Sequence, residues 1–161
     1  MKTRFGPISG DDREVVIDLL NYYVDNSFAA FPESKVPYEW FDRYMAMSEG
    51  LPTATLQDPA GHLLGFGMLR KTKPLPTFAH TAEITYFIDH NHTGRGLGTA
   101  LLEFLVEAGK SRGLTTILAE ISSLNERSIR FHAKNGFVEC GRFKSVGKKK
   151  GQFFDTVWMQ K

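Results

Sequence analysis

The feature that most constrains the fold is a run of three alternating glycines that joins a predicted strand to a predicted helix. The run Thr93 to Thr99 (TGRGLGT) follows the apolar, β-branched segment Thr81 to Asp89 and opens into apolar residues at helical spacing. A turn of this kind directs free backbone amides and the positive end of the helix dipole to one point. We therefore predict that the segment His92 to Thr99 holds the diphosphate of a ligand.

Three other interpretations of this loop were weighed. A P-loop places Lys and then Ser or Thr after its last glycine, whereas Gly98 is followed by Thr99 and Ala100, which disfavours nucleotide triphosphate hydrolysis. A dinucleotide-binding loop has a glycine where Thr99 stands and an acidic residue downstream, for which Glu120 is the candidate. That loop follows the first strand of its sheet, but this one follows about four extended segments, so we rank it lower. The structural alternative is a tight turn without a ligand.

Hydrophobic periodicity predicts four helices. Ser9 and Asp12 form a pair that resembles a capping box, and apolar residues recur after them at helical spacing: Val15, Val16, Leu19, Leu20 and Tyr23. Pro37 suits a first helical position, and Gly136 suits the residue after a helix end. The predicted helices cover a first segment from Asp12 to about Tyr23, then Pro37 to Ser48, Leu97 to about Gly113, and Asn125 to Asn135.

Seven segments have strand character: Thr3 to Ile8, Thr53 to Gln57, His62 to Leu69, Thr81 to Asp89, Thr115 to Ile121, Phe137 to Val146, and Gln152 to Gln160. The order of strands and helices predicts a mixed sheet with helices on both faces and one right-handed parallel crossover at its centre. The fold class is α/β, or α+β in some schemes.

Length and charge exclude several classes of protein. A chain of 161 residues is expected to form one domain, residues 1–161, and its net charge of +2 is far from that of a nucleic-acid binder. The lone Cys140, the absence of an apolar run of about 20 residues and a start without a signal-peptide pattern favour a cytoplasmic protein without a membrane partner. The basic turn Lys148 to Lys150 is interpreted as a solvated hairpin tip rather than an anion-binding wall.

Six ordered segments together resemble the GNAT acetyltransferases, and more narrowly the phosphinothricin and methionine sulfoximine acetyltransferase branch. They are Asn21 to Ser27, Pro37 to Trp40, Ala82 to Asp89, Gly94 to Thr99, Asn125 to His132, and Asp155 to Trp158. The resemblance covers almost the whole chain. It implies a GNAT fold with about six or seven mostly antiparallel strands and about four helices. It also implies an enzyme that moves the acetyl group of acetyl-CoA directly to the primary amine of a small, amino-acid-like acceptor, without a metal, as a homodimer.

The resemblance also assigns the acetyl-CoA site. The pantetheine arm is expected between two splayed strands, pairing with strand backbone. A backbone amide near Phe87 or Ile88 is expected to polarise the thioester carbonyl. Thr93 departs from the family pattern, which has Gln or Arg there. The residues assigned to the cofactor are Tyr86, Phe87, Ile88, Gly94, Arg95, Gly96, Leu97, Gly98, Thr99 and Asn125.

Acetyl transfer also requires a base for the amine and an acid for the leaving thiolate. Glu83 matches a family glutamate that acts as base through water, and the alternative is an edge carboxylate of the sheet. His132 stands where many members carry a tyrosine that acts as acid. The residues expected to line the acceptor pocket are Phe31, Arg70, Lys73 and Phe78, the last in place of a family tyrosine. Two other functions use the same acyl-CoA site: a non-catalytic acyl-CoA sensor, and an acetyltransferase for protein N-termini or lysines.

Overall fold

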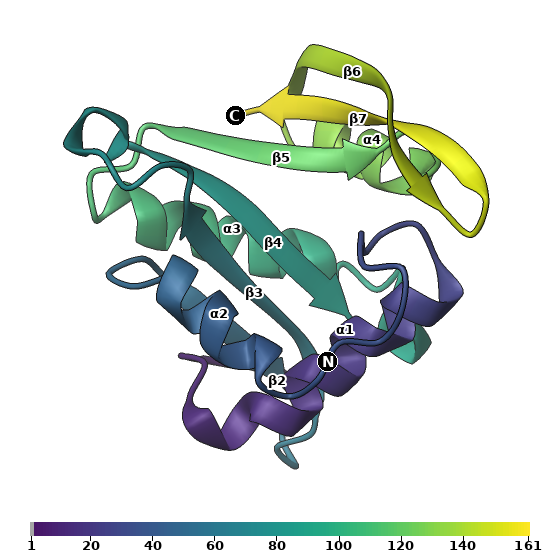
Figure 1. Cartoon of the computed structure of the whole chain (residues 1–161). Helices are drawn as coiled ribbons and strands as arrows, with labels where there is room; N and C mark the ends of the chain where they lie inside the picture. The colour runs from purple at the N-terminus through teal and green to yellow at the C-terminus, as the bar shows by residue number, and fades with distance from the viewer. Residues whose placement is uncertain (1) are drawn as a thin grey trace.

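The computed structural model describes residues 2–161, and its seven strands form one mixed sheet in the order β1-β2-β3-β4-β5-β7-β6 (Figure 1). The β4–β5 pair is parallel, and the other neighbouring strands are antiparallel. The strands are β1 (Arg4–Gly6), β2 (Thr53–Gln57), β3 (Leu63–Lys71), β4 (Thr81–Ile88), β5 (Thr116–Ser122), β6 (Val138–Lys149) and β7 (Gln152–Gln160).

Two helices cover each face of this sheet (Figure 1). They are α1 (Arg13–Asn26) and α2 (Trp40–Met47) on one face, and α3 (Leu97–Lys110) and α4 (Glu126–Lys134) on the other. Three short 3₁₀ turns complete the order: η1 (Gly10–Asp12), η2 (Pro76–Phe78) and η3 (His90–His92). None of the helices in residues 2–161 has the length and apolar character to cross a membrane.

The face under α3 carries the larger hydrophobic core. Leu101, Leu102 and Leu105 of α3 are fully buried, and burial of each contributes about 2 kcal/mol. A Cβ atom on Gly67 of β3 would lie 2.8 Å from both the Leu105 Cδ1 and the Tyr86 Cβ. Gly67 is therefore what allows the helix to approach the sheet so closely.

The opposite face is covered by α1. Val16, Ile17, Leu20 and Val24 point into the sheet, at the spacing of one helical stripe. The predicted stripe included Val15, which is instead 47% exposed. The buried stripe of α1 is thus rotated from the predicted one, toward Ile17 and Val24.

The strands β4 and β5 diverge. Their parallel register pairs Thr81 with Thr116, Ala82 with Ile117 and Glu83 with Leu118, and within residues 2–161 no pairing continues beyond Glu83. The remainder of β4, as far as Ile88, still pairs with β3 on its other side. Figure 1 shows the two strands separating toward the end of β4 that leads into α3. This divergence leaves one edge of β4 free to pair with a ligand.

The predicted order of elements and the fold class are confirmed, with differences at the boundaries. Helix α2 begins at Trp40 rather than Pro37, because Pro37 lies in a turn whose carbonyl accepts from the Trp40 amide at 3.0 Å. Strand β6 runs to Lys149 rather than Val146, because it passes an irregularity in which Ser145 has a φ of 51°.

The prediction of a solvated basic turn is wrong for Lys149. Its side chain is 1% exposed, and its Nζ donates to the carbonyls of Ser27 at 2.8 Å and Ala30 at 2.7 Å. The neighbouring Lys148 remains at the surface, 5.0 Å above the Phe153 ring. The hairpin of β6 and β7 is therefore bound to the loop that follows α1, which sequence patterning of charges does not reveal.

Candidate active site

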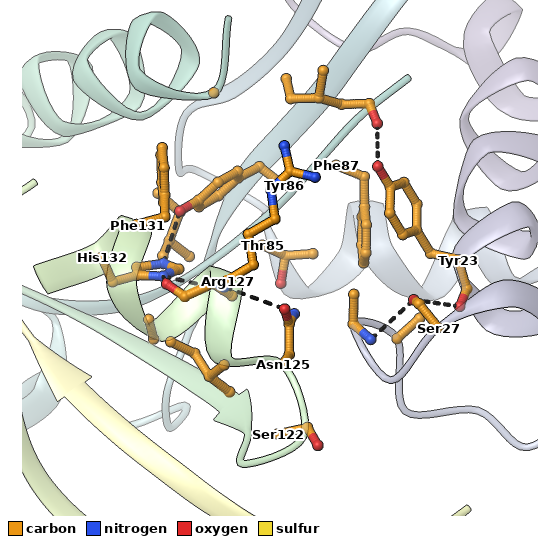
Figure 2. Close-up of a pocket in the computed structure, with 18 of the residues that line it drawn as sticks. Tyr23, Ser27, Thr85, Tyr86, Phe87, Ser122, Asn125, Arg127, Phe131 and His132 are labelled. Atoms are coloured by element: carbon orange, nitrogen blue, oxygen red, sulfur yellow. Dashed lines mark hydrogen bonds between the residues drawn. The ribbon is translucent and has the colours of Figure 1, made fainter. Parts of the chain in front are cut away.

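A cavity of about 790 Å³ lies where β4 and β5 diverge. Side chains from both strands, from α1, from α4 and from the glycine loop line it. Figure 2 shows the side chains of α4 on one side of this space and Tyr23 and Ser27 on the other. The cavity thus connects the glycine loop to the sheet face that α1 and α2 cover.

The glycine loop has the conformation that an anion site requires. Gly94 and Gly96 have φ values of 78° and 80°, and Gly96 is the residue that precedes α3. Within 4 Å of a Cβ built on either glycine there is no other atom, so the space before the loop is open. Gly98 and Thr99 also line the cavity, as does Thr93. The loop therefore leaves room for a diphosphate next to the first amides of the helix.

Two residues assigned to the cofactor from this loop lie elsewhere. Arg95 points to the surface, where its Nη2 donates to the Asn91 carbonyl at 3.3 Å, and it is not among the residues that line the cavity. Leu97 is buried in the core beside Leu56 and Leu64. The Leu97 side chain is therefore unavailable to a ligand, and the Arg95 side chain lies outside the cavity. The glycine pattern predicts a position for the loop backbone but not for these two side chains.

The end of β4 is fixed by α1. Tyr86, Phe87 and Ile88 all line the cavity, and the Tyr23 hydroxyl donates to the Ile88 carbonyl at 2.6 Å (Figure 2). The rings of Tyr23 and Phe87 pack with centroids 5.2 Å apart. These contacts hold the open strand edge in place, which is the arrangement predicted for a strand whose amides bind a ligand.

His132 lies at the wall of the cavity and is 5% exposed. Its Nδ1 lies 2.8 Å from the Ser128 carbonyl, which can only accept, so Nδ1 carries the hydrogen. Its Nε2 then accepts from the Tyr86 hydroxyl at 2.7 Å (Figure 2). Burial lowers the pKa of His132 and raises that of Tyr86, so the neutral imidazole and the protonated phenol are both favoured. The pair forms one hydrogen-bonded unit facing the ligand space.

Asn125 combines a structural role with a place at the cavity. Its Oδ1 accepts from the Ser128 amide at 3.2 Å, which caps α4, and the residue also lines the cavity. The position of Asn125 is therefore compatible with the cofactor contact expected from the resemblance, while the same side chain caps α4.

A polar cluster lies at the other end of the cavity. The Arg70 guanidinium donates from Nη2 to the Glu83 carboxylate at 3.1 Å and from Nε to the Thr85 hydroxyl at 2.9 Å. Glu120 lines the same cavity, and burial together with the charge of Glu83 raises the pKa of its carboxyl. Two carboxylates and one guanidinium give this end an excess of negative charge, which suits an ammonium group.

The predicted acceptor residues divide into two groups. Phe31 and Arg70 line the cavity, and the Phe31 ring stacks on Phe154 with centroids 5.8 Å apart. Lys73 and Phe78 lie in the loop after β3, where the Lys73 Nζ sits 4.6 Å above the Phe78 ring, and they are not among the lining residues. These two side chains pack on each other outside the cavity, away from the space where an acceptor would lie.

Sequence reasoning missed three contributors: Tyr23, Glu120 as a cavity residue, and Lys149. For Glu120 a signal exists, because Ile117, Ala119 and Ile121 alternate with it and are buried under α3. In a strand this alternation places Glu120 on the other face, together with Glu83. Tyr23 and Lys149 act through contacts distant in sequence, for which no local signal exists. No cluster of residues suited to a metal ion occurs in the described part of the chain.

Comparison with known proteins agrees with this geometry. The model of the acetyltransferase (GNAT) family matches residues 16–137. An L-methionine sulfoximine/L-methionine sulfone acetyltransferase of Pseudomonas paraeruginosa is 32% identical, over 90% of this chain and 86% of the relative. A phosphinothricin N-acetyltransferase of Streptomyces viridochromogenes is 26% identical, over 96% of this chain and 85% of the relative.

Solved structures show the same fold. The ribosomal-protein-alanine N-acetyltransferase of Brucella melitensis has a TM-score of 0.89 and 28% identity, covering 98% of both chains. A GNAT superfamily phosphinothricin acetyltransferase of Sinorhizobium meliloti in complex with acetyl-CoA has a TM-score of 0.92 and 24% identity, covering 100% of this chain and 88% of that one. The chain therefore belongs to the GNAT family of N-acetyltransferases, whose acyl donor is acetyl-CoA.

Proposed function

We propose that this enzyme transfers the acetyl group of acetyl-CoA directly to the primary amine of a small, amino-acid-like acceptor of the phosphinothricin, methionine sulfone or methionine sulfoximine type. One observation carries the proposal. A single cavity joins the glycine loop at one end to the cluster of Arg70, Glu83 and Glu120 at the other, along the open edge of β4. The cavity therefore brings a site for a diphosphate and a site for an ammonium group to the same strand.

The donor is proposed to lie along this strand. Its diphosphate would meet the amides of Gly94 to Thr99, and its pantetheine arm would pair with the β4 edge near Phe87 and Ile88. Asn125 lies beside this path. An amide of β4 that donates to the thioester carbonyl stabilises the charge that develops on its oxygen.

The acceptor amine is protonated near neutral pH, so it must lose a proton before its nitrogen can attack the thioester. The bound ammonium loses one proton to a carboxylate that acts as base, a role that the family resemblance gives to Glu83 acting through water. The free amine then attacks the thioester carbon. As the C–N bond forms the C–S bond breaks, and the sulfur leaves as a thiolate. The nitrogen gives up its second proton and the thiolate gains one, so the products are the amide and free CoA.

The proton for the thiolate is proposed to pass through the pair of His132 and Tyr86. This pair faces the cavity, with His132 buried and Tyr86 half-buried, and its hydrogen bond of 2.7 Å provides a path between the two groups. The second proton of the attacking nitrogen would pass to the Tyr86 oxygen as the phenol proton passes to the neutral His132 Nε2, and the reverse transfer would deliver one proton to the thiolate.

Two observations support the acceptor class. The names of the relatives describe enzymes that act on methionine sulfoximine, methionine sulfone and phosphinothricin. In this chain Phe31 and Trp40 provide apolar walls next to Arg70, whose Nη1 is not used by Glu83 or Thr85. A guanidinium next to an apolar wall suits an acceptor that carries a carboxylate and an uncharged side chain.

The homodimer implied by the family resemblance is also proposed. Its support is the edge strand β6, which exposes Val138, Phe143 and Val146, together with Phe153 of β7, each at least 60% exposed. An edge strand with several exposed apolar side chains is typical of a surface that a second chain covers. Light scattering that reports a monomer at micromolar concentration would contradict this part of the proposal.

The test of the main proposal is thiol release from acetyl-CoA with a panel of amines. Turnover with phosphinothricin, methionine sulfone or methionine sulfoximine is the expected result. Turnover only with peptides would favour the protein N-terminal alternative, for which the Brucella melitensis structure is the relevant relative. Binding of acetyl-CoA without turnover of any amine would favour an acyl-CoA sensor.

A further inference from the structure

Glu120 lies on the part of β5 that has separated from β4, whereas Glu83 belongs to the last pair of the parallel register. That register pairs Glu83 with Leu118, and Glu120 follows two residues further along β5 on the same face of the strand. Both carboxylates line the cavity. Of the two, Glu120 is therefore the one that stands where the strands diverge and the ligand space opens.

The two carboxylates also differ in their partners. One Oε of Glu83 is occupied by Arg70, and the side chains of this ion pair are about one-fifth exposed. Glu120 accepts no hydrogen bond from a side chain and forms no ion pair within residues 2–161, although it lines the same cavity. Its antiparallel neighbour on β7 is Trp158, which carries no charge. Glu120 is thus a carboxylate with an open face toward the acceptor.

We propose that Glu120, rather than Glu83, is the catalytic residue that accepts the proton of the bound ammonium, directly or through one water, while the Arg70–Glu83 pair holds the acceptor in place. This rests on the proposed acetyl transfer and deepens it. The N–H bond of the ammonium breaks, its electron pair stays on nitrogen, and the proton moves to a carboxylate oxygen of Glu120. After the acetylated product leaves, the carboxyl returns this proton to solvent.

The electrostatics of the cavity support this role. The charged groups that face Glu120 are Glu83 of β4 and Arg70 of β3, and Tyr44 of α2 and Arg127 of α4 line the same cavity. Burial and the negative charge of Glu83 together outweigh Arg70 and raise the pKa of Glu120. A carboxylate whose pKa is raised holds a proton more tightly, and is a better base near neutral pH, than an unperturbed one.

The experiment compares Glu120→Gln with wild type and with the control Glu103→Gln, which alters an exposed glutamate on α3 outside the cavity. The measurement is kcat/KM for the best amine of the panel, from about pH 6 to about pH 9.5, together with the affinity for acetyl-CoA. With a base removed, we expect kcat/KM to fall by about 10²-fold near pH 7. The loss should shrink as pH rises, because more of the amine then arrives already deprotonated.

Wild-type turnover is measured first, so that absence of any turnover counts against the proposed function rather than against Glu120. Glu120→Gln is folded if its affinity for acetyl-CoA is unchanged and its melting temperature is unchanged or higher. The conservative variant Glu120→Asp should recover part of the activity. The proposal is overturned if Glu120→Gln keeps the wild-type kcat/KM near pH 7, or if its loss is the same at every pH. It is also overturned if Glu103→Gln loses as much activity.

Discussion

The buried ammonium of Lys149 offers a direct test of how the acceptor side is held together. It donates to the carbonyls of Ser27 and Ala30, in the loop that carries Phe31 over the cavity. Two further contacts join the same elements: the Lys150 amide donates to the Glu33 carboxylate at 3.0 Å, and the Lys150 Nζ donates to the Asp25 carbonyl. Replacing Lys149 with Met keeps the aliphatic stem and removes only the charge and its donors.

The magnitude follows from the two hydrogen bonds. A hydrogen bond to a charged group contributes about 1.5–3 kcal/mol, so the gross loss is about 3–6 kcal/mol. Removing the ammonium also relieves the cost of burying it, a cost visible in the lowered pKa of Lys149. The net loss we expect is about 2–3 kcal/mol, which for a chain of this size lowers the melting temperature by about 4–12 °C.

The assay combines thermal unfolding with steady-state kinetics, and Lys148→Met, an exposed neighbour, is the control. Because the loop lines the acceptor end, the KM for the amine should rise by about tenfold, a loss of about 1.4 kcal/mol, while the KM for acetyl-CoA stays unchanged. The reasoning is refuted if Lys149→Met melts at the wild-type temperature, or if both KM values rise together.

Three further predictions concern the other parts of the site. Gly96→Ala places a side chain at a φ of 80°, which costs about 1 kcal/mol and should raise the KM for acetyl-CoA more than that for the amine; equal effects on both would contradict the loop assignment. Burial lowers the pKa of His132 in the folded protein. Below the unfolded-state pKa of about 6.5 the unfolded chain therefore binds a proton that the folded chain does not, so the protein should become less stable as the pH falls. In His132→Asn the melting temperature should therefore fall less between about pH 7 and about pH 5, and an equally steep fall would contradict the burial argument. Glu83→Gln removes the ion-pair partner of Arg70 and should raise the KM for the amine, measured beside Glu103→Gln; an unchanged KM would exclude Glu83 from acceptor binding.

Much of the fold is encoded in local patterns. The alternating glycines identify the central crossover, which joins Thr81–Ile88 to Leu97–Lys110. Glycines in this pattern leave backbone amides free for an anion when a strand precedes them and a helix follows. The apolar spacing of α3 and the β-branched character of β5 are equally local. The positions of Glu83, His132 and Asn125 around one cavity follow once that crossover is in place.

The remainder depends on contacts that join distant segments. The burial of Lys149 requires the loop after α1, which lies about 120 residues earlier in the chain. The pairing of Lys73 with Phe78, and the direction of Arg95 toward the surface, depend on loop conformations that charge and aromatic content do not determine. A larger share of the residues predicted for the donor than of those predicted for the acceptor therefore lines the cavity.

The most direct test of the central claim is the amine panel itself, with the acetylated product identified by mass spectrometry. The account predicts that free CoA and the N-acetyl product of an amino-acid-like amine appear in equal amounts, and that neither appears when the amine is omitted. Binding of acetyl-CoA without any acetylated amine, across amino acids, their sulfone, sulfoximine and phosphinic analogues, and peptides, would contradict it.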